Sequence, residues 1–424
     1  MRNRTASPLE LVEAHIAEFE HRNPQVNAFI QPLHDQARER AMQPLSGPLA
    51  GVPVTVKDSF DITGLPTYCG SKLRLLHRAD RNAAVVERFL AAGAIILGKT
   101  NTPEFLMNYE SDNHIAGRTN NPLDLTRTSG GSSGGESAAI AAYMSAGGIG
   151  SDGGGSVRWP AFCCRIVGLK PTPGRISMIG HFPVSSHPSG FMGVAGPMAR
   201  TVADVRILFD VLKGYDPEDP FSAPVDVAPT AARPRIGVWP QFYATPVQPA
   251  CVELVAKAAK RLAAAGFPVD EFEPRGLERA PNLWAFLFSE MSAPFLRDMI
   301  DGRRADTHWT GVEMLDMVGS TLEPSGRRVV EILSARDAMR ANLLRQMREF
   351  PVILTAGAGM EAFPHRSRRY PTATKEIGLF EGTFPLTWAN LLGLPALAVA
   401  GVQLVGAPYS DELLLDIGEA LTRQ

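Results

Sequence analysis

Hydrophobic and polar positions alternate regularly over several stretches of the chain. Leu and Ile recur at helical spacing over residues 8–21, after a Ser-Pro pair that is typical of a helix start. Within residues 50–60, valine occupies every second position, which is the period of a β-strand. Residues 82–94 return to helical spacing and end at a glycine, and the apolar run 94–97 predicts a short buried strand. This succession predicts a parallel or mixed sheet covered by helices.

Helical patterns dominate much of the second half of the chain. They predict helices over residues 201–213, 249–265, 326–349 and 410–422, while short apolar runs alternate with loops from residue 351. The longest apolar stretch, 391–408, contains two prolines and three glycines and is shorter than the roughly 20 residues that cross a bilayer. We therefore interpret it as buried strands and turns, with no membrane span. No internal repeat or linker stands out, so one domain over residues 1–424 is expected.

Composition and charge exclude several classes of function. Of the 424 residues, 45% are hydrophobic and 20% charged, which is ordinary for a globular protein. The formal net charge is −2 without a basic block, which argues against a nucleic-acid partner. Four cysteines are too few for a disulfide framework, and the adjacent Cys163 and Cys164 lack metal-ligand spacing. The N-terminus does not resemble a secretory signal, so a cytoplasmic protein without a metal site is expected.

A phosphate-binding pattern occurs at residues 93–100, where two glycines flank four residues and Lys99-Thr100 follow. A phosphate loop needs a glycine-bearing turn whose backbone amides surround the anion, followed by a helix. Here the four intervening residues are Ala, Ile, Ile and Leu, which belong in a buried strand, and a loop follows Thr100. We interpret this segment as a strand end with a solvated or structural Lys99.

A first serine-glycine cluster, GGSSGG at residues 130–135, fits the nucleophile elbow pattern centred on Ser132 or Ser133. The elbow requires a hydrophobic strand directly before it, whereas the preceding residues form a polar stretch. A Ser-His-Asp triad would also need a downstream histidine, and no candidate stands in a distinctive setting: His181, His187, His308 and His365. The sequence therefore gives little support to a nucleophile elbow with a Ser-His-Asp triad.

A second cluster, SDGGGSVR at residues 151–158, places three consecutive glycines directly before Ser156. Such a run lets several backbone N–H groups converge on one point, as an oxyanion hole requires. A tight turn or an anion-binding loop is the alternative interpretation. Because Ser132 and Ser156 lie 24 residues apart and a segment of small residues with helical character joins them, the two clusters together favour a serine hydrolase site.

The stretch 130–175 resembles the signature of the amidase signature family over its whole length. The resemblance continues upstream through GVPVTVKDSF, GAIILGKTNTPEF and RTNNPLDLTRTS, and downstream through GPMARTVADV and GLPALAVAGVQLVG, so it covers nearly the whole chain. It implies a single α/β/α domain with a mixed, mostly parallel central sheet of about eleven strands, covered by helices on both faces. Residues 130–175 would form the signature core, and about 270–350 a more variable helical region around the substrate pocket.

The resemblance also assigns roles by position. Ser156 would be the nucleophile, Ser132 a bridging serine held by a cis peptide bond after Gly131, and Lys57 the base. Lysine can act as a base only when neutral, so burial or nearby positive charge must lower its pKa. Further backbone and side-chain groups would complete the site: Gly153, Gly154, Gly155 and Ser156 as oxyanion-hole amides, with Ser133, Asp152 and Arg158 as supporting side chains. No metal or organic cofactor is implied.

The chain departs from the family pattern at a few positions. The family usually has Thr where this chain has Ser151, Gly where it has Arg165, and a larger residue where it has Gly153. Glu136 occurs in only part of the family. The connection before Gly401 is also shorter than in most members, which leaves open whether this loop is trimmed or residues are absent from the sequence.

The expected activity is hydrolysis of a linear amide, or of a related ester or hydrazide, from a small-molecule acyl amide. One alternative is an amidotransferase A-type subunit that generates ammonia for transamidation, although residues 176–195 do not match the segment typical of such subunits. Another is a non-catalytic binding protein on the same fold, against which the retained catalytic residues argue. The sequence does not determine the acyl group or the leaving group of the substrate, nor whether the protein forms a homodimer.

Candidate pocket residues follow the TNTPEF segment: Met107, Asn108 and Tyr109. Helices within residues 282–335 are expected to line the acyl side of the pocket. Aromatic and Met side chains in that region point to an apolar pocket, or equally to a buried structural stripe: Trp284, Phe286, Phe288, Met291 and Phe295.

Overall fold

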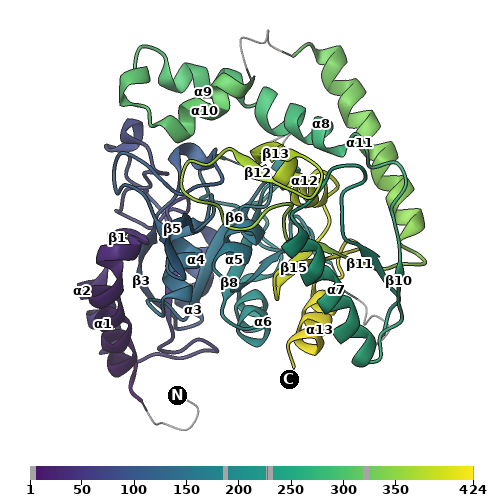
Figure 1. The fold of residues 1–424 in the computed structure, drawn as a ribbon. Helices are drawn as coiled ribbons and strands as arrows, with labels where there is room; N and C mark the ends of the chain where they lie inside the picture. The colour runs from purple at the N-terminus through teal and green to yellow at the C-terminus, as the bar shows by residue number, and fades with distance from the viewer. Residues whose placement is uncertain (1–5, 185–189, 226, 228–232, 319–323, 424) are drawn as a thin grey trace.

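The computed structural model describes residues 6–184, 190–225, 227, 233–318 and 324–423. Within these residues one eleven-stranded sheet runs through the molecule (Figure 1). Its strands, in spatial order, are β1 (Phe29–Pro32), β3 (Ile95–Thr100), β2 (Pro53–Lys57), β6 (Gly147–Asp152), β8 (Val194–Ala199), β7 (Val167–Lys170), β14 (Ala396–Val399), β15 (Val402–Gly406), β11 (Val352–Ala356), β9 (Ile236–Trp239) and β10 (Val269–Glu271). Two small hairpins stand apart, β4 (Asn120–Asn121) with β5 (Asp124–Thr128) and β12 (Arg369–Pro371) with β13 (Glu376–Gly378).

The predicted mixed sheet of about eleven strands is confirmed. Parallel pairing is confined to β3–β2–β6 and β11–β9–β10, and the other neighbours along the sheet pair antiparallel. Parallel pairs therefore do not predominate among the described strands. Two-residue and other short connections, such as the one between β14 and β15, can only join antiparallel strands, whereas parallel neighbours need a crossover.

Helices cover both faces of the sheet, and the alternation of side chains along each strand divides the core between them. In β2, Val54 and Val56 pack on one face, in the core formed with α3 (Ala84–Ala91), α6 (Val202–Leu212), α7 (Pro249–Ala264) and α13 (Asp411–Thr422). By the same alternation Thr55 and Lys57 point to the opposite face. On that face lie α4 (Gly134–Ala141), α5 (Arg158–Cys163), α8 (Ala280–Ala285) and α12 (Leu379–Leu391). This face carries the polar site described below.

The remaining helices lie at the margins of the sheet. Helices α1 (Pro8–Val26) and α2 (His34–Ala41) pack at the end of the sheet that carries β1 and β3. In Figure 1, α9 (Ala293–Ile300) and α10 (Trp309–Val318) lie at the upper left, α8 at the upper centre, and α11 (Gly326–Gln346) runs down the right side of the molecule. No helix of the described part of the chain is both long and apolar enough to cross a membrane.

Most helix starts follow the sequence signals. Ser7 caps α1 through a capping box with Glu10, and α6, α7, α11 and α13 occupy the predicted ranges within a few residues. Helices α2, α5 and α12 were not predicted, and for α12 the sequence indicated only loops and short apolar runs. Ten of its 13 residues are buried, so it is apolar around most of its circumference and shows no helical period.

The short connection before Gly401 closes as a tight hairpin. Val399 pairs with Val402, and the two residues between them, Ala400 and Gly401, have φ values of 51° and 80°. Two successive residues with positive φ form the two-residue turn that best matches strand twist. The chain thus joins β14 to β15 without a further loop.

Lys99, the lysine of the phosphate-binding pattern, has a structural role. It lies in β3, fully buried, with Nζ 2.8 Å from Asp58 Oδ1 and donating to Pro66 O and Thr67 Oγ1 at 2.7 and 2.9 Å. The glycine pattern therefore marks a strand end, as the sequence indicated.

Candidate active site

Lys57 ends β2 beside β6, and the two strands run parallel, so the C-terminal ends of both reach the same edge of the sheet. Its side chain is completely buried. The ammonium nitrogen Nζ lies 2.7 Å from Ser132 Oγ, 3.0 Å from Ser151 Oγ and 3.3 Å from Ser151 O. Lys57 is thus held between the two serine-glycine clusters.

Burial lowers the pKa of Lys57 to about 7, because the charged form loses its hydration. The negative potential of Asp152 and Glu136 acts in the opposite direction and limits this fall. A lysine with a pKa near neutrality carries a substantial neutral fraction at physiological pH, as a proton acceptor must.

Glu136 belongs to α4 and is also fully buried. Thr55 Oγ1 donates to Oε1 at 2.5 Å, and Thr100 Oγ1 donates to Oε2 at 2.7 Å. Burial raises the pKa of Glu136 to about 7, against the effect of these two hydroxyl donors. An added Cβ at Gly148 of β6 would lie 2.1 Å from Oε1, so the glycine makes room for this carboxyl group.

Ser132 follows a cis peptide bond after Gly131, as the resemblance implied. Gly131 has no space for a side chain, because a Cβ there would lie 2.6 Å from Asn108 O and 2.7 Å from Tyr109 C. The second serine, Ser133, ties the clusters together: its N–H donates to Ser156 O at 3.2 Å and its hydroxyl donates to Ser151 O at 3.3 Å.

The glycine loop before Ser156 is fixed through its carbonyl groups. Trp284 Nε1–H donates to Gly153 O at 2.9 Å, Tyr109 Oη–H to Gly154 O at 2.8 Å, and the N–H of Trp159 to Gly155 O at 2.7 Å. In a trans peptide the N–H points away from the C=O, so these bonds set the directions of the N–H groups of Gly154, Gly155 and Ser156. Three carbonyl anchors therefore define the geometry of the loop.

The same loop is packed too closely for side chains. A Cβ at Gly153 would lie 2.8 Å from the ring of Phe288, and one at Gly154 would lie 2.3 Å from the ring of Trp284. Gly155 has φ of 109°, a conformation that favours glycine, and a Cβ there would meet Leu386 at 2.8 Å. All three glycines are required by close packing.

Gly155 does not fit its predicted place in the oxyanion hole. Its N–H donates to Asp152 Oδ1 at 2.7 Å, so this amide is already engaged inside the protein. Gly153 and Ser156, in contrast, line the cavity described below. The run of three glycines in the sequence gave no indication of which amides would turn toward the carboxylate.

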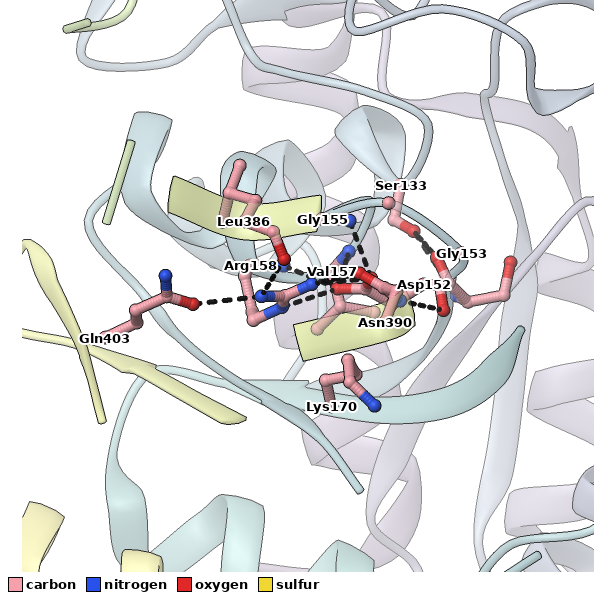
Figure 2. A network of polar contacts seen from close by, with 12 residues as sticks. Ser133, Asp152, Gly153, Gly155, Val157, Arg158, Lys170, Leu386, Asn390 and Gln403 are labelled. Carbon is pink, nitrogen blue, oxygen red and sulfur yellow. Dashed lines mark hydrogen bonds and ion pairs between the residues drawn. The ribbon is translucent and has the colours of Figure 1, made fainter. Parts of the chain in front are cut away.

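Asp152 and Arg158 form a completely buried ion pair below the loop (Figure 2). Arg158 Nε donates to Asp152 Oδ2 at 3.0 Å and Nη2 to Oδ1 at 3.1 Å. Burial acts to raise the pKa of Asp152, but Arg158 holds it well below its ordinary value. The N–H groups of Gly155 and Val157 also donate to this carboxylate, so the ion pair organises the turn that presents Ser156.

Sequence reasoning missed several polar groups that support this ion pair. Asn390 of α12 donates from Nδ2 to Asp152 Oδ1 at 2.9 Å, and Arg158 Nη1 donates to Gln403 Oε1 at 2.9 Å. Lys170 of β7 lies beside the network in Figure 2 and is also fully buried. Gln403 interrupts the apolar run 391–408, and that isolated polar residue was the one available signal.

A cavity of about 390 Å³ opens at the two serine clusters. Ser132, Ser151 and Ser156 line one end of it, and Met107 is part of the wall. The other two predicted pocket residues are absent from the described lining. Asn108 donates to Glu313 Oε2 at 2.8 Å, and Tyr109 holds the glycine loop as described above.

The histidines considered for a triad are scattered. His181 lines the cavity, whereas His308 lies near Asp112 and His365 near Glu110, and neither of these two is part of the described lining. His187 falls outside the described residues. Among the residues that the structure covers, no three His, Cys, Asp or Glu side chains gather as metal ligands would, and all four cysteines are buried and free.

This arrangement can carry a proton between hydroxyl groups. A buried amine with a pKa near 7 contacts one serine hydroxyl, and that serine shares a cavity wall with a second, partly exposed serine. Such a constellation supplies a base, a relay and a nucleophile without a histidine.

Comparisons with known proteins agree over the full length of the chain. The family model described as Amidase matches residues 10–415. The A-type subunit of glutamyl-tRNA(Gln) amidotransferase from Chloroflexus aurantiacus is 34% identical, with 98% of this chain and 93% of that protein covered. Indoleacetamide hydrolase of Bradyrhizobium diazoefficiens is 30% identical over 99% of this chain and 84% of its own length. The structure of 6-aminohexanoate cyclic dimer hydrolase superposes with a TM-score of 0.86, at 30% identity, covering 99% of this chain and 94% of that one.

Proposed function

The chain belongs to the amidase family of enzymes that hydrolyse carbon–nitrogen bonds, and on that premise we propose that it cleaves a linear amide through an acyl-enzyme on Ser156. In this proposal Ser132 relays the proton and Lys57 is the base. The observation that carries it is the buried contact of 2.7 Å between Lys57 Nζ and Ser132 Oγ.

The contacts of Lys57 fit a neutral amine. A neutral amine has two N–H donors and one lone pair, and Nζ has three polar contacts. Ser151 O can only accept, and Ser151 Oγ can accept as well, so both N–H groups find acceptors on one residue. The lone pair then faces Ser132 Oγ, which donates its proton to it. This assignment supports Lys57 as the base at neutral pH.

Acylation begins when Ser132 gives its proton to Lys57 and takes the proton of Ser156. The Ser156 oxygen forms a bond to the amide carbon, whose carbonyl oxygen becomes an oxyanion. When the C–N bond breaks, the proton returns from Lys57 through Ser132 to the leaving nitrogen. Water then loses a proton by the same route and attacks the ester, and Ser156 leaves with that proton, which regenerates the free enzyme.

The proposed oxyanion donors are the backbone amides of Gly153, Gly154 and Ser156. Gly155 is left out because Asp152 already accepts its N–H. Fixed N–H groups stabilise the charge that develops on the carbonyl oxygen without reorganising during the reaction. The Trp284 side chain, which holds Gly153 O, fixes the N–H of Gly154, and the N–H of Trp159, which holds Gly155 O, fixes that of Ser156.

Similarity to the A-type subunits of amidotransferases favours one second candidate, a protein that generates ammonia for a tRNA-linked reaction. The same serines and lysine would serve it, so the reaction centre does not separate the two. Residues 176–195, the segment whose sequence argued against such a subunit, line the cavity through Met178, Gly190 and Gly193. We therefore favour the free-standing hydrolase.

The experiment is ammonia release from a panel of primary amides by the purified chain, compared with Ser156→Ala, Ser132→Ala and Lys57→Ala. We expect each variant to lose at least about 10³-fold in kcat, because the three residues act as one unit. Full activity in Ser156→Ala would contradict the proposal. Ammonia release that requires an added tRNA-dependent partner would favour the amidotransferase candidate.

A further inference from the structure

The cavity beyond the serines has an apolar wall. Twelve of its lining residues are apolar: Phe105, Leu106, Met107, Met178, Phe182, Pro183, Val184, Phe288, Met291, Phe295, Leu296 and Met299. Four of its six polar lining residues belong to the reaction centre, namely Ser132, Ser151, Asp152 and Ser156, and the other two are His181 and Ser292. The cavity therefore has a reactive end and an apolar body.

Two irregular segments contribute to this body. The 3-10 turn Glu104–Leu106 places Phe105 and Leu106 in left-handed backbone conformations, with φ of 52° and 64°. Much later in the sequence, the π-helix Phe286–Glu290 carries Phe288, whose ring lies over Gly153 and stacks on Trp284 at 4.8 Å between ring centroids. Such π-helical turns are frequent at functional sites. Phe288 thus brings an aromatic face next to the glycine loop.

Four methionines and four phenylalanines share the wall. Thioethers are polarisable and adapt their shape, and they make favourable contacts with aromatic rings, as aromatic side chains do with one another. Phe295 is 70% exposed and Val184 is 75% exposed, so apolar side chains continue to the mouth of the cavity. A ligand ring would meet sulfur and aromatic partners along its whole path.

Charge is almost absent from the described lining. Asp152 and His181 are its titratable residues. The Asp152 carboxylate is satisfied by Arg158, Asn390 and the turn amides, as shown above. His181 lies with Nδ1 2.8 Å from Pro183 O, and burial lowers its pKa to about 3, so its ring is neutral at pH 7. A charged group buried in this body would find no free counter-ion among the described lining residues, and burying it would be costly.

We infer that the acyl group of the substrate is neutral and carries an aromatic ring, as in an aryl or arylalkyl carboxamide. This inference rests on the proposed function, since it places the scissile amide at Ser156 and the acyl group along the Met and Phe wall. Zwitterionic amino-acid amides such as glutamine are excluded by the same wall.

The first test compares kcat/KM of the wild-type chain for three primary amides that all release ammonia: phenylacetamide, hexanamide and glutamine. We expect phenylacetamide to be the best substrate and glutamine to be at least about 100-fold poorer, because its two charges would be buried unpaired. The inference would be overturned if glutamine were hydrolysed as efficiently as phenylacetamide. A higher kcat/KM for hexanamide than for phenylacetamide would contradict the aromatic ring and indicate a linear acyl chain.

The second test places a cation in the wall. Met291→Lys should lower kcat/KM for phenylacetamide. The ratio of kcat/KM for succinamate, the monoamide of a dicarboxylic acid, to kcat/KM for phenylacetamide should rise by at least about tenfold, because the new ammonium can form an ion pair with the carboxylate of succinamate in an apolar site. Met42→Lys is the matched control, since Met42 is 69% exposed and lies outside the cavity lining. An unchanged ratio in Met291→Lys would contradict the assignment of the wall, and Met299→Lys repeats the test on another helix turn.

Labelling of Ser156 by a fluorophosphonate distinguishes a failure of the inferred acyl group from a failure of the proposed hydrolase function. It requires a folded and reactive site but no particular acyl group. Labelled Ser156 with unselective hydrolysis would defeat the substrate class alone. No labelling and no hydrolysis of any amide would defeat the proposed function.

Discussion

Lys57 Nζ lies 2.7 Å from Ser132 Oγ, although 75 residues separate them in the chain. Strand β2 ends at Lys57, and the loop before α4 carries Ser132 to the same edge of the sheet. Ser151 can accept two N–H bonds from this nitrogen, so a neutral Lys57 would direct its lone pair toward Ser132, as the proposed base must. This relationship connects the fold to a testable chemistry.

The pH dependence of the reaction should report the protonation of Lys57. Its pKa lies near 7, and only the neutral form can take a proton, so kcat/KM should rise with pH through this region and level off above it. The measurement is kcat/KM for a neutral amide from pH 5 to 9. A rate that falls as pH rises from 6 to 8 would contradict Lys57 as the base.

Glu136→Gln should shift the rise of kcat/KM with pH to lower pH. The pKa of Glu136 is also near 7, and wherever its carboxylate is ionised it favours the charged form of Lys57, so a neutral amide in its place lets the pKa of Lys57 fall further. Gln keeps a carbonyl oxygen that accepts from one of Thr55 and Thr100. The control is Glu253→Gln on α7, whose side chain is 68% exposed and which should leave the pH profile unchanged. A shift to higher pH would show that Glu136 does not act on the base through its charge.

Trp284→Phe should lower kcat about tenfold with little change in KM. The ring is largely kept, but the N–H that anchors Gly153 O is lost, and loosened oxyanion donors weaken the transition state more than the bound substrate. Trp239→Phe is a matched control, since Trp239 Nε1 is buried and has no hydrogen-bond partner among the described residues. An equal loss of kcat in both variants would point to general destabilisation.

Arg158→Met should lower the free energy of unfolding by about 3–5 kcal/mol, because it leaves the Asp152 carboxylate buried without its cation. Arg22→Met removes an exposed pair with Glu18 and should cost less than about 1 kcal/mol. Urea unfolding followed by circular dichroism measures both values. Equal stabilities of the two variants would mean that the buried pair does not support the loop.

Local periodicity predicted a mixed sheet and many of the helices, whereas the roles of the three groups of the relay came from the resemblance to the amidase signature family. The sequence did not predict α12, which is apolar around most of its surface and therefore shows no period. It placed Gly155 in the oxyanion hole, whereas the N–H direction depends on Asp152, a contact that spacing alone does not reveal.

The sequence also did not predict the hydrogen-bond partners that reach the glycine loop from distant segments of the chain. Asn390 and Trp284 reach the loop from residues more than 100 positions away, and neither stands in a recognisable motif. Arg165 illustrates the reverse case: the family pattern usually has Gly there, and the structure gives Arg165 a positive φ of 55°, which explains the preference for glycine.

The most direct test of the relay is peptide mapping after treatment with a fluorophosphonate, carried out on the wild-type chain and on Lys57→Ala at pH 8. We expect a single labelled serine, Ser156, and labelling slowed by at least about 100-fold in Lys57→Ala, since the nucleophile then lacks its base. Labelling of Ser132 or Ser133 in place of Ser156, or an unchanged rate in Lys57→Ala, would contradict the proposed relay.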